Sequence, residues 1–167
     1  QTSMRKRMIC LFYKMTLRDK LCHGDFHPGN FLFKKNENKI EMCILDFGVT
    51  HHITKSTQRA LYYLYKSIAS NNDADFEVFF KSALHEDKNL NDVLSKMISQ
   101  LKNKNDFLRK NKKKGKGNTP QIIKAAFQIV HDNKMIFRGT IFNMLLQILM
   151  LHENVDVKGK NKSIFMD

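Results

Sequence analysis

Apolar residues recur at helical spacing along most of the chain. Near the N-terminus one such stripe faces a surface rich in Arg and Lys, which is typical of an amphipathic helix. Its apolar members are Met4, Met8, Leu11, Phe12 and Met15. Because methionine packs readily into irregular cores, we interpret this stripe as core rather than as part of a cofactor site.

Five later segments show the same periodicity and begin at residues that favour helix starts. Thr54 or Ser56, and then Asn72 or Asp73, are suitable N-caps, and Thr119-Pro120 places a proline in a first turn. The helices expected after the first one cover approximately residues 54–70, 72–84, 91–101, 119–130 and 137–152.

A different pattern separates the first helix from the others. Two mostly apolar runs, 31–33 and 40–45, flank the turn-like segment 35–39, which predicts a β-hairpin. The predicted fold class is therefore mainly α with a small β-hairpin. A two-stranded ribbon places Asn30 at the start of one strand and Asp46 at the end of the other, so both side chains are expected at one end of the hairpin.

The residues that border this hairpin carry the candidate chemistry. The sequence His23-Gly24-Asp25-Phe26-His27-Pro28-Gly29-Asn30 precedes it, and Asp46-Phe47-Gly48 follows it. In kinase catalytic loops a catalytic Asp stands five residues before a metal-binding Asn, and a later D-F-G supplies a second metal ligand. The same order and spacing predict Asp25 as the catalytic residue and Asn30 and Asp46 as ligands of Mg²⁺ beside ATP.

Two histidines in the catalytic loop have different expected roles. We expect His23 to hold the loop by hydrogen bonds to the backbone near Asp46. His27 lies two residues after Asp25, where many protein kinases carry a Lys that touches the transferred phosphate. We therefore count His27 among the cofactor-binding candidates, with a turn-packing role as the alternative. Pro28-Gly29 predicts a tight turn, and Gly24 and Gly29 permit close approach of backbone to a ligand.

Composition narrows the class of protein. The chain has 167 residues, 42% of them hydrophobic, which suits one domain or most of one lobe. The longest apolar run, Met144 to Leu151, is interrupted by Gln147 and is far shorter than the roughly 20 residues that span a bilayer. No signal peptide or transmembrane segment is apparent. The three cysteines lack C-x-x-C spacing, so neither a disulfide framework nor a zinc site is indicated.

The net charge of +13 is concentrated in one segment. Residues 102–116 hold eight Lys or Arg against one acidic residue, Asp106. Such blocks are usually solvated, and the single aromatic residue there, Phe107, falls short of a base-stacking platform. The sequence therefore predicts a flexible basic insert at 102–118 and argues against nucleic acid as a main partner. A contact of this segment with nucleic acid or acidic lipid is the alternative.

Taken together, the H-x-D-x-H-P-G-N loop, the hairpin and the L-D-F-G resemble the UbiB-type atypical kinases, also called the ABC-one or cytochrome-bc-complex-activity family. The similarity covers residues 17–84, and Arg138-Gly139-Thr140 resembles the family more loosely. The resemblance implies a protein-kinase-like C-lobe that uses ATP and Mg²⁺. It also implies a kinase or ATPase that supports lipid-quinone (ubiquinone) synthesis in mitochondria, plastids or bacteria.

The part of such an enzyme that covers the nucleotide has no counterpart here. Only 24 residues precede Asp25, and the family's K-x-G-Q signature and Ala-rich loop are absent. We therefore expect residues 1–154 to be the C-lobe of a longer protein, inactive alone, followed by a polar tail at 155–167. A lipid-quinone or membrane-surface partner is expected, as is a mitochondrial location in a eukaryotic family member.

Two other interpretations remain open. Small-molecule kinases of the aminoglycoside or choline type also use an H-x-D-x-x-x-x-N loop, but they usually follow the metal-binding Asp with a different acidic pattern. The second alternative is a catalytically incomplete scaffold that binds acidic partners. The presence of Asp25, Asn30 and Asp46 together argues against full loss of the site.

Overall fold

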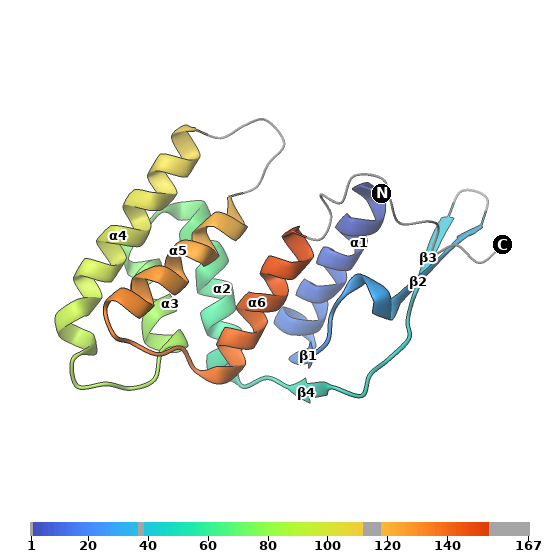
Figure 1. The fold of residues 1–167 in the computed structure, drawn as a ribbon, viewed down its shortest axis with the longest axis horizontal. Coiled ribbons are helices and arrows are strands. Elements are labelled where there is room, and N and C mark those ends of the chain that lie inside the picture. The colour runs from blue at the N-terminus through green and yellow to red at the C-terminus, as the bar shows by residue number, and fades with distance from the viewer. Residues whose placement is uncertain (1, 37–38, 112–117, 154–167) are drawn as a thin grey trace. The chain divides into compact units, whose positions relative to one another are not determined.

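The computed structural model describes residues 2–36, 39–111 and 118–153 and is mainly helical, with two small antiparallel sheets (Figure 1). Two compact units divide the chain: residues 1–53 with 146–167, and residues 54–145. Each is described separately below. Helix α6 (Gly139–Glu153) contributes residues to both units.

The first unit begins with α1 (Thr2–Tyr13), which continues into a π-helical turn at Lys14–Arg18. The N-terminal helix predicted from the apolar stripe is thus confirmed. Met8, Phe12 and Met15 are buried, as expected for its core-facing residues. The widening of the last turn is visible in the bond from Asp19 N–H to Lys14 O, a five-residue span.

Two short sheets complete the first unit. Strands β2 (Phe31–Asn36) and β3 (Lys39–Ile44) form the predicted hairpin, with Phe31 opposite Ile44. Strand β1 (Leu21–His23) pairs with β4 (Thr50–His52), placing Cys22 opposite His51. Strand β4 lies directly after Gly48 and Val49, where the sequence predicted no strand. This second pairing brings residues 21–23 and residues 50–52 together.

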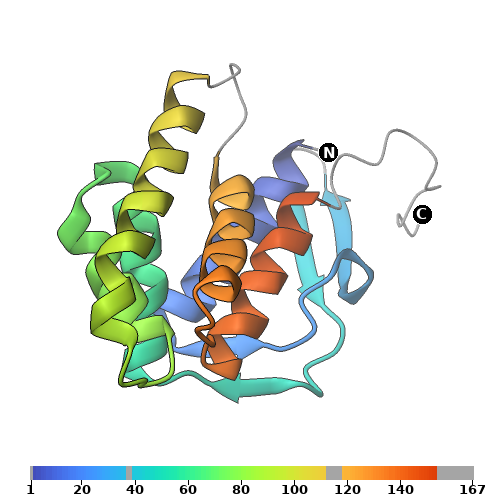
Figure 2. The same cartoon turned by 60° about the vertical axis from the view of Figure 1, so that its left-hand side comes forward.

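In the described part of the second unit there are four helices and the start of α6. They are α2 (Lys55–Ser70), α3 (Asp73–Ala83), α4 (Leu90–Lys110) and α5 (Thr119–Asp132). The caps predicted for α2 and α3 are present, because Thr54 Oγ1 accepts from Thr57 N–H at 3.1 Å and Asn72 Oδ1 accepts from Ala74 N–H at 2.9 Å. Helices α4 and α5 run side by side (Figure 2).

Helix α4 corrects the expectation of a basic insert beginning at residue 102. The helix continues to Lys110 because polar residues in this part of it have partners within the unit. Asn105 is fully buried and donates to Ile68 O at 3.1 Å, and Lys102 Nζ lies 2.7 Å from Asp73 Oδ1. The hydrogen bond with Asp73 raises the pKa of Lys102. Residues 112–117 of the expected insert lie outside the described residues.

Helix α6 agrees closely with the predicted last helix. Arg138, the residue before it, contacts two other segments of the second unit. The Arg138 guanidinium donates from Nε to Leu84 O at 2.9 Å and from Nη1 to Ser56 Oγ at 3.0 Å. Within the described residues, no helix combines the length and the apolarity needed to cross a bilayer. The tail expected at 155–167 lies outside the described residues.

Candidate active site

Residues 23–30, which hold three of the four candidate residues, form a compact turn within the first unit. Strand β1 ends at His23, and a 3₁₀ turn at Pro28–Asn30 leads directly into β2. Backbone bonds from His27 N–H to Asp25 O and from Asn30 N–H to His27 O, both 3.0 Å, close the loop between them. The Pro-Gly turn predicted here is therefore present, and it folds Asn30 back toward Asp25.

A buried aromatic residue anchors this exposed turn. Phe26 is 2% exposed, and its ring lies 5.4 Å from that of Phe12 and 4.7 Å from that of Phe31. Asp25, immediately before it, keeps 57% of its side chain exposed. Edge-on aromatic packing of this kind fixes the backbone beneath a polar side chain. The role of Phe26 was missed in the sequence, where an apolar residue flanked by Asp25 and His27 was the available signal.

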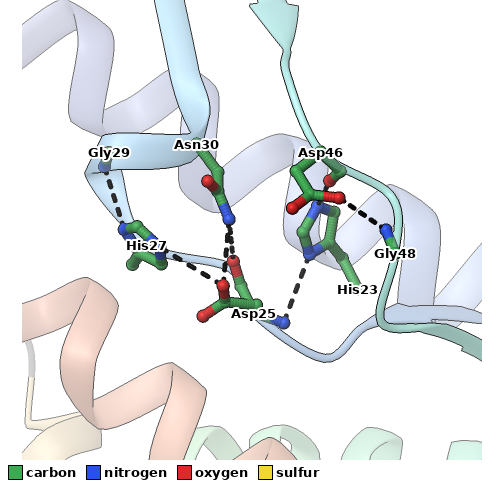
Figure 3. Close-up of polar contacts among 7 residues, drawn as sticks. All are labelled: His23, Asp25, His27, Gly29, Asn30, Asp46 and Gly48. Atoms are coloured by element: carbon green, nitrogen blue, oxygen red, sulfur yellow. Dashed lines mark hydrogen bonds and ion pairs between the residues drawn. The ribbon is translucent and has the colours of Figure 1, made fainter.

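Asp25 and Asn30 are in direct contact. Asn30 Nδ2 donates to Asp25 O at 2.9 Å and to Asp25 Oδ2 at 3.2 Å (Figure 3). Because the amide nitrogen is directed at Asp25, the amide oxygen of Asn30 is left for another partner. The five-residue spacing of the motif thus brings together the two side chains that the sequence placed in one site.

Asp46 lies at the same end of the hairpin. Leu45 N–H donates to Asn30 O at 2.9 Å, which extends the pairing of β2 and β3 by one step and places Asp46 directly after it. One carboxylate oxygen, Oδ1, accepts from Gly48 N–H at 2.7 Å. The other faces the side on which Asn30 and Asp25 lie (Figure 3). It takes part in no hydrogen bond with the described residues.

His23 connects the loop to the D-F-G segment as predicted. The buried ring bonds through Nε2 to the backbone carbonyl of Asp46, while Nδ1 accepts from Asp25 N–H at 3.3 Å. One imidazole therefore contacts the backbone of both acidic residues. Phe47, next to Asp46, remains 53% exposed although its ring lies 5.6 Å from that of His23.

Gly24 permits the close approach of another backbone segment, whereas we expected it to permit the approach of a ligand. Its N–H donates to Val49 O at 2.5 Å, and a Cβ at this position would lie 2.8 Å from the same oxygen. The close neighbour of Gly24 is therefore the segment after Gly48. This contact and the β1–β4 pairing hold residues 23–25 against residues 46–50.

His27 lies beside Asp25. Nδ1 accepts from Gly29 N–H at 3.0 Å, and Nε2 lies 3.4 Å from Asp25 Oδ2. His51 and His52 are exposed on β4. The structure thus brings three of the four candidates into one polar cluster and places Asp46 next to it.

The donor set suits a hard divalent cation. Carboxylate and amide oxygens are the ligands that Mg²⁺ prefers, and Asn30 and Asp46 each offer one oxygen that the hydrogen bonds above leave open. Among the described residues, no group of three His, Cys, Asp or Glu is arranged to hold a metal. One amide oxygen and one carboxylate oxygen are too few to fill the coordination sphere of Mg²⁺, so further ligands would be needed.

Cys22, next to His23 on β1, has no place in this chemistry. It is fully buried, and burial raises the pKa of its thiol to about 11, while a weak contact with Gln147 Oε1 at 3.9 Å acts in the opposite direction. A thiol of this kind stays protonated near neutral pH and is a poor nucleophile.

Comparison with known families finds a match over approximately the first half of the chain. Residues 1–80 match the ABC1 atypical kinase-like domain. This range contains Asp25, His27, Asn30 and Asp46, and it supports a relationship of the chain to the atypical kinases. The ABC1 match ends before Arg138-Gly139-Thr140, so the looser resemblance there is not part of it.

One curated relative is similar over a shorter stretch. An uncharacterized protein encoded in the hydrogenase 1 5′ region of Clostridium pasteurianum is 36% identical over 56 residues, which make up 34% of this chain and 10% of the relative. The chain thus spans about a tenth of the length of that relative. No solved structure matches the chain.

Proposed function

We propose that this chain supplies the catalytic loop and the metal-binding residues of an ATP- and Mg²⁺-dependent kinase-like enzyme. The whole protein is then an atypical phosphotransferase or ATPase of the UbiB type, linked to ubiquinone synthesis. The observation that carries the proposal is the contact of Asn30 with Asp25 at the end of a hairpin that also ends in Asp46.

Each side chain has a distinct task in this proposal. Asp25 orients the acceptor hydroxyl or water and takes its proton. Asn30 and Asp46 would hold Mg²⁺, which would supply positive charge to neutralise the phosphates. The bond from Gly48 N–H to Asp46 Oδ1 leaves the second oxygen of that carboxylate available as a ligand. His27 lies at the edge of this group.

The match to the ABC1 domain supports this assignment over a small-molecule kinase of the aminoglycoside or choline type. The remaining half of the active site, which covers the nucleotide, is provided by other parts of the full-length protein in this proposal. A kinase-like C-lobe, a lipid-quinone or membrane-surface partner and inactivity of the isolated chain are likewise parts of the proposal.

The proposal is tested by thermal-shift titration of the full-length protein with ATP and Mg²⁺. Ligand linkage predicts about 2.7 kcal/mol of stabilisation at about a hundredfold excess over the dissociation constant. The decisive variant is Asp46→Asn, since an Asn oxygen can still accept from Gly48 N–H while the negative charge is lost. Glu41→Gln, an exposed acid-to-amide change on β3, is the matched control.

We expect the Mg²⁺-dependent shift to disappear in Asp46→Asn and to persist in Glu41→Gln. An unchanged shift in Asp46→Asn overturns the metal assignment. If the wild-type protein shows no shift, the scaffold alternative takes precedence. That alternative predicts binding to acidic partners that weakens steeply with salt and survives the loss of both Asp25 and Asp46.

A further inference from the structure

The hydrogen bonds of His27 define which of its nitrogens carries the proton. Nδ1 accepts the Gly29 N–H at 3.0 Å, and an accepting ring nitrogen carries no hydrogen of its own. The neutral ring therefore holds its proton on Nε2. This nitrogen lies 3.4 Å from Asp25 Oδ2, which places the carboxylate as its nearest charged neighbour in the loop (Figure 3).

The same carboxylate oxygen accepts a hydrogen bond from Asn30. Asn30 Nδ2 donates to Oδ2 of Asp25 at 3.2 Å. Asn30 and His27 therefore both lie beside Oδ2, while Oδ1 receives no hydrogen bond from the described residues. Because the side chain is 57% exposed, Oδ1 is accessible to an incoming group.

We propose that His27 is a positioning residue, which together with Asn30 holds Oδ2 of Asp25 so that Oδ1 is presented as the base. The inference rests on the proposed function. When the acceptor oxygen forms its bond to the terminal phosphorus of ATP, its proton passes to Oδ1. The bond from that phosphorus to the ADP oxygen breaks, and ADP leaves with the electron pair.

The sequence around His27 is suited to this task. A Cβ on residue 29 would lie 2.8 Å from Cε1 and 3.0 Å from Nδ1 of the His27 ring, so Gly29 leaves the space that the ring needs. His23 uses the same local arrangement, because its Nδ1 accepts the N–H of Asp25, also two residues later. The two rings differ in what their Nε2 atoms meet: a backbone carbonyl for His23 and a carboxylate for His27.

The role proposed for His27 differs from that of a residue that contacts phosphate. A histidine whose Nε2 lies beside Asp25 acts on the base and only indirectly on the nucleotide. Loss of the contact is therefore expected to lower kcat, with the KM for ATP largely unchanged. Loss of a phosphate contact made in both ground and transition states raises KM instead.

Two substitutions in the full-length protein distinguish the two nitrogens. The Asn side chain in His27→Asn offers an oxygen near the place of Nδ1 and can accept from Gly29 N–H, but it is too short to reach Asp25. In His27→Gln the amide nitrogen is placed near the position of Nε2 and can donate to Oδ2. His52→Asn, at an exposed position on β4, is the control.

The assay is Mg²⁺-dependent phosphate release from ATP. We expect His27→Asn to lower kcat by about tenfold to a hundredfold, the range that misplacement of a reacting group produces, and His27→Gln to recover most of the loss. Wild-type kcat in His27→Asn overturns the proposal. An equal loss in both variants also overturns it, because the donor is then not the property that matters.

A second readout is independent of activity. The ¹⁵N resonances of the His27 ring at neutral pH distinguish a proton on Nε2 from a proton on Nδ1. We expect the Nε2–H form, and we expect its signal to move in Asp25→Asn; a proton on Nδ1 overturns the contact. If wild-type protein neither binds nor hydrolyses ATP while the ring is in the Nε2–H form, the proposed function fails and the His27–Asp25 contact stands.

Discussion

The ring of His23 bonds through Nε2 to the backbone carbonyl of Asp46, a residue 23 positions later in the chain. Its other nitrogen accepts from the N–H of Asp25. A single buried side chain thus sets the separation between the proposed base and the proposed metal ligand. Since this link is made through backbone atoms, it leaves both carboxylates available for chemistry.

Substitution of His23 is expected to loosen this connection. In His23→Asn the shorter side chain can still accept near the position of Nδ1 but cannot reach the carbonyl of Asp46. This bond is only partly buried, and the loss of a hydrogen bond of this kind costs about 0.5–1.5 kcal/mol. We expect a loss of that size in the free energy of unfolding by chemical denaturation, and faster amide hydrogen exchange at residues 46–48.

His52→Asn serves as the control for this variant as well. Its side chain is exposed, so a change within about 0.5 kcal/mol is expected. Equal stability of His23→Asn and His52→Asn would show that the bond to Asp46 contributes little.

The contact between Gly24 and Val49 gives a second prediction. In Gly24→Ala the new methyl group would lie 2.5 Å from Val49 Cγ1 and 2.8 Å from Val49 O. The side chain can rotate away, but the backbone oxygen belongs to the pairing with Gly24 N–H and cannot move freely. We expect a loss of about 1–3 kcal/mol in unfolding free energy, the usual cost of overpacking.

A matched glycine provides the comparison. Gly139, at the start of α6, has no atom within 4 Å of an added Cβ. Gly139→Ala is therefore expected to be neutral or to stabilise the protein by up to about 1 kcal/mol, through the better helix propensity of Ala. The prediction fails if thermal denaturation places both variants on the same side of the wild type.

Local signals in the sequence were sufficient for the helices and the hairpin. Thr54 and Asn72 are N-caps whose hydrogen bonds reach residues only two or three positions away. Both the residue type and the spacing of such caps can therefore be recognised in the sequence. Strands β1 and β4 were not predicted because each has only three residues and its partner lies far along the chain. Such pairing depends on tertiary contacts that a short window does not contain.

Charge misled the prediction at residues 102–110. A run of Lys and Arg suggested a solvated insert, yet Asn105 is buried and Lys102 is paired with Asp73, whose position in α3 the sequence pattern does not reveal. In the candidate site, the sequence predicted the bond of His23 to the backbone at Asp46 and the position of Asn30 and Asp46 at one end of the hairpin, but not the direct contact of Asn30 with Asp25. The approach of His27 to Asp25 depends on the conformation of the Pro28–Gly29 turn and was not predictable.

The three cysteines provide a test of burial in the first unit. Cys10 and Cys43 are exposed, whereas Cys22 is buried and its pKa is raised to about 11 by burial. Because the thiolate is the reactive form, we expect a maleimide at pH 7.5 to label Cys10 and Cys43 rapidly and Cys22 slowly. Peptide mass spectrometry of the time course measures each site.

Labelling of Cys22 is expected to reach the rate of the other two only in denaturant. A Cys22 that reacts as fast as Cys43 in the native protein is incompatible with the pairing of β1 and β4 as described. The variant His23→Asn offers an internal comparison, since loosening of that segment should raise the rate at Cys22 selectively.

The buried carboxylate of Asp75 provides a prediction for the second unit. Lys66 Nζ lies 2.8 Å from Asp75 Oδ1, and Ser70 Oγ donates to Oδ2 at 2.8 Å. The hydrogen bond from Lys66, followed by that from Ser70, lowers the pKa of Asp75 in the folded protein. Because the folded pKa is below the unfolded value of about 3.9, the resulting stability is fully present above that value. It is lost as the pH falls through the folded pKa.

We therefore expect Asp75→Asn to melt at a lower temperature than the wild type at pH 7, and the difference to shrink as the pH falls below about 4. Asp92→Asn, an exposed position in the first turn of α4, is the control and should differ from the wild type far less at pH 7. Melting curves of the three proteins between pH 7 and pH 2.5 measure the effect. A gap between wild type and Asp75→Asn that stays constant across this range contradicts the prediction, because it would place the role of Asp75 in packing and not in its charge.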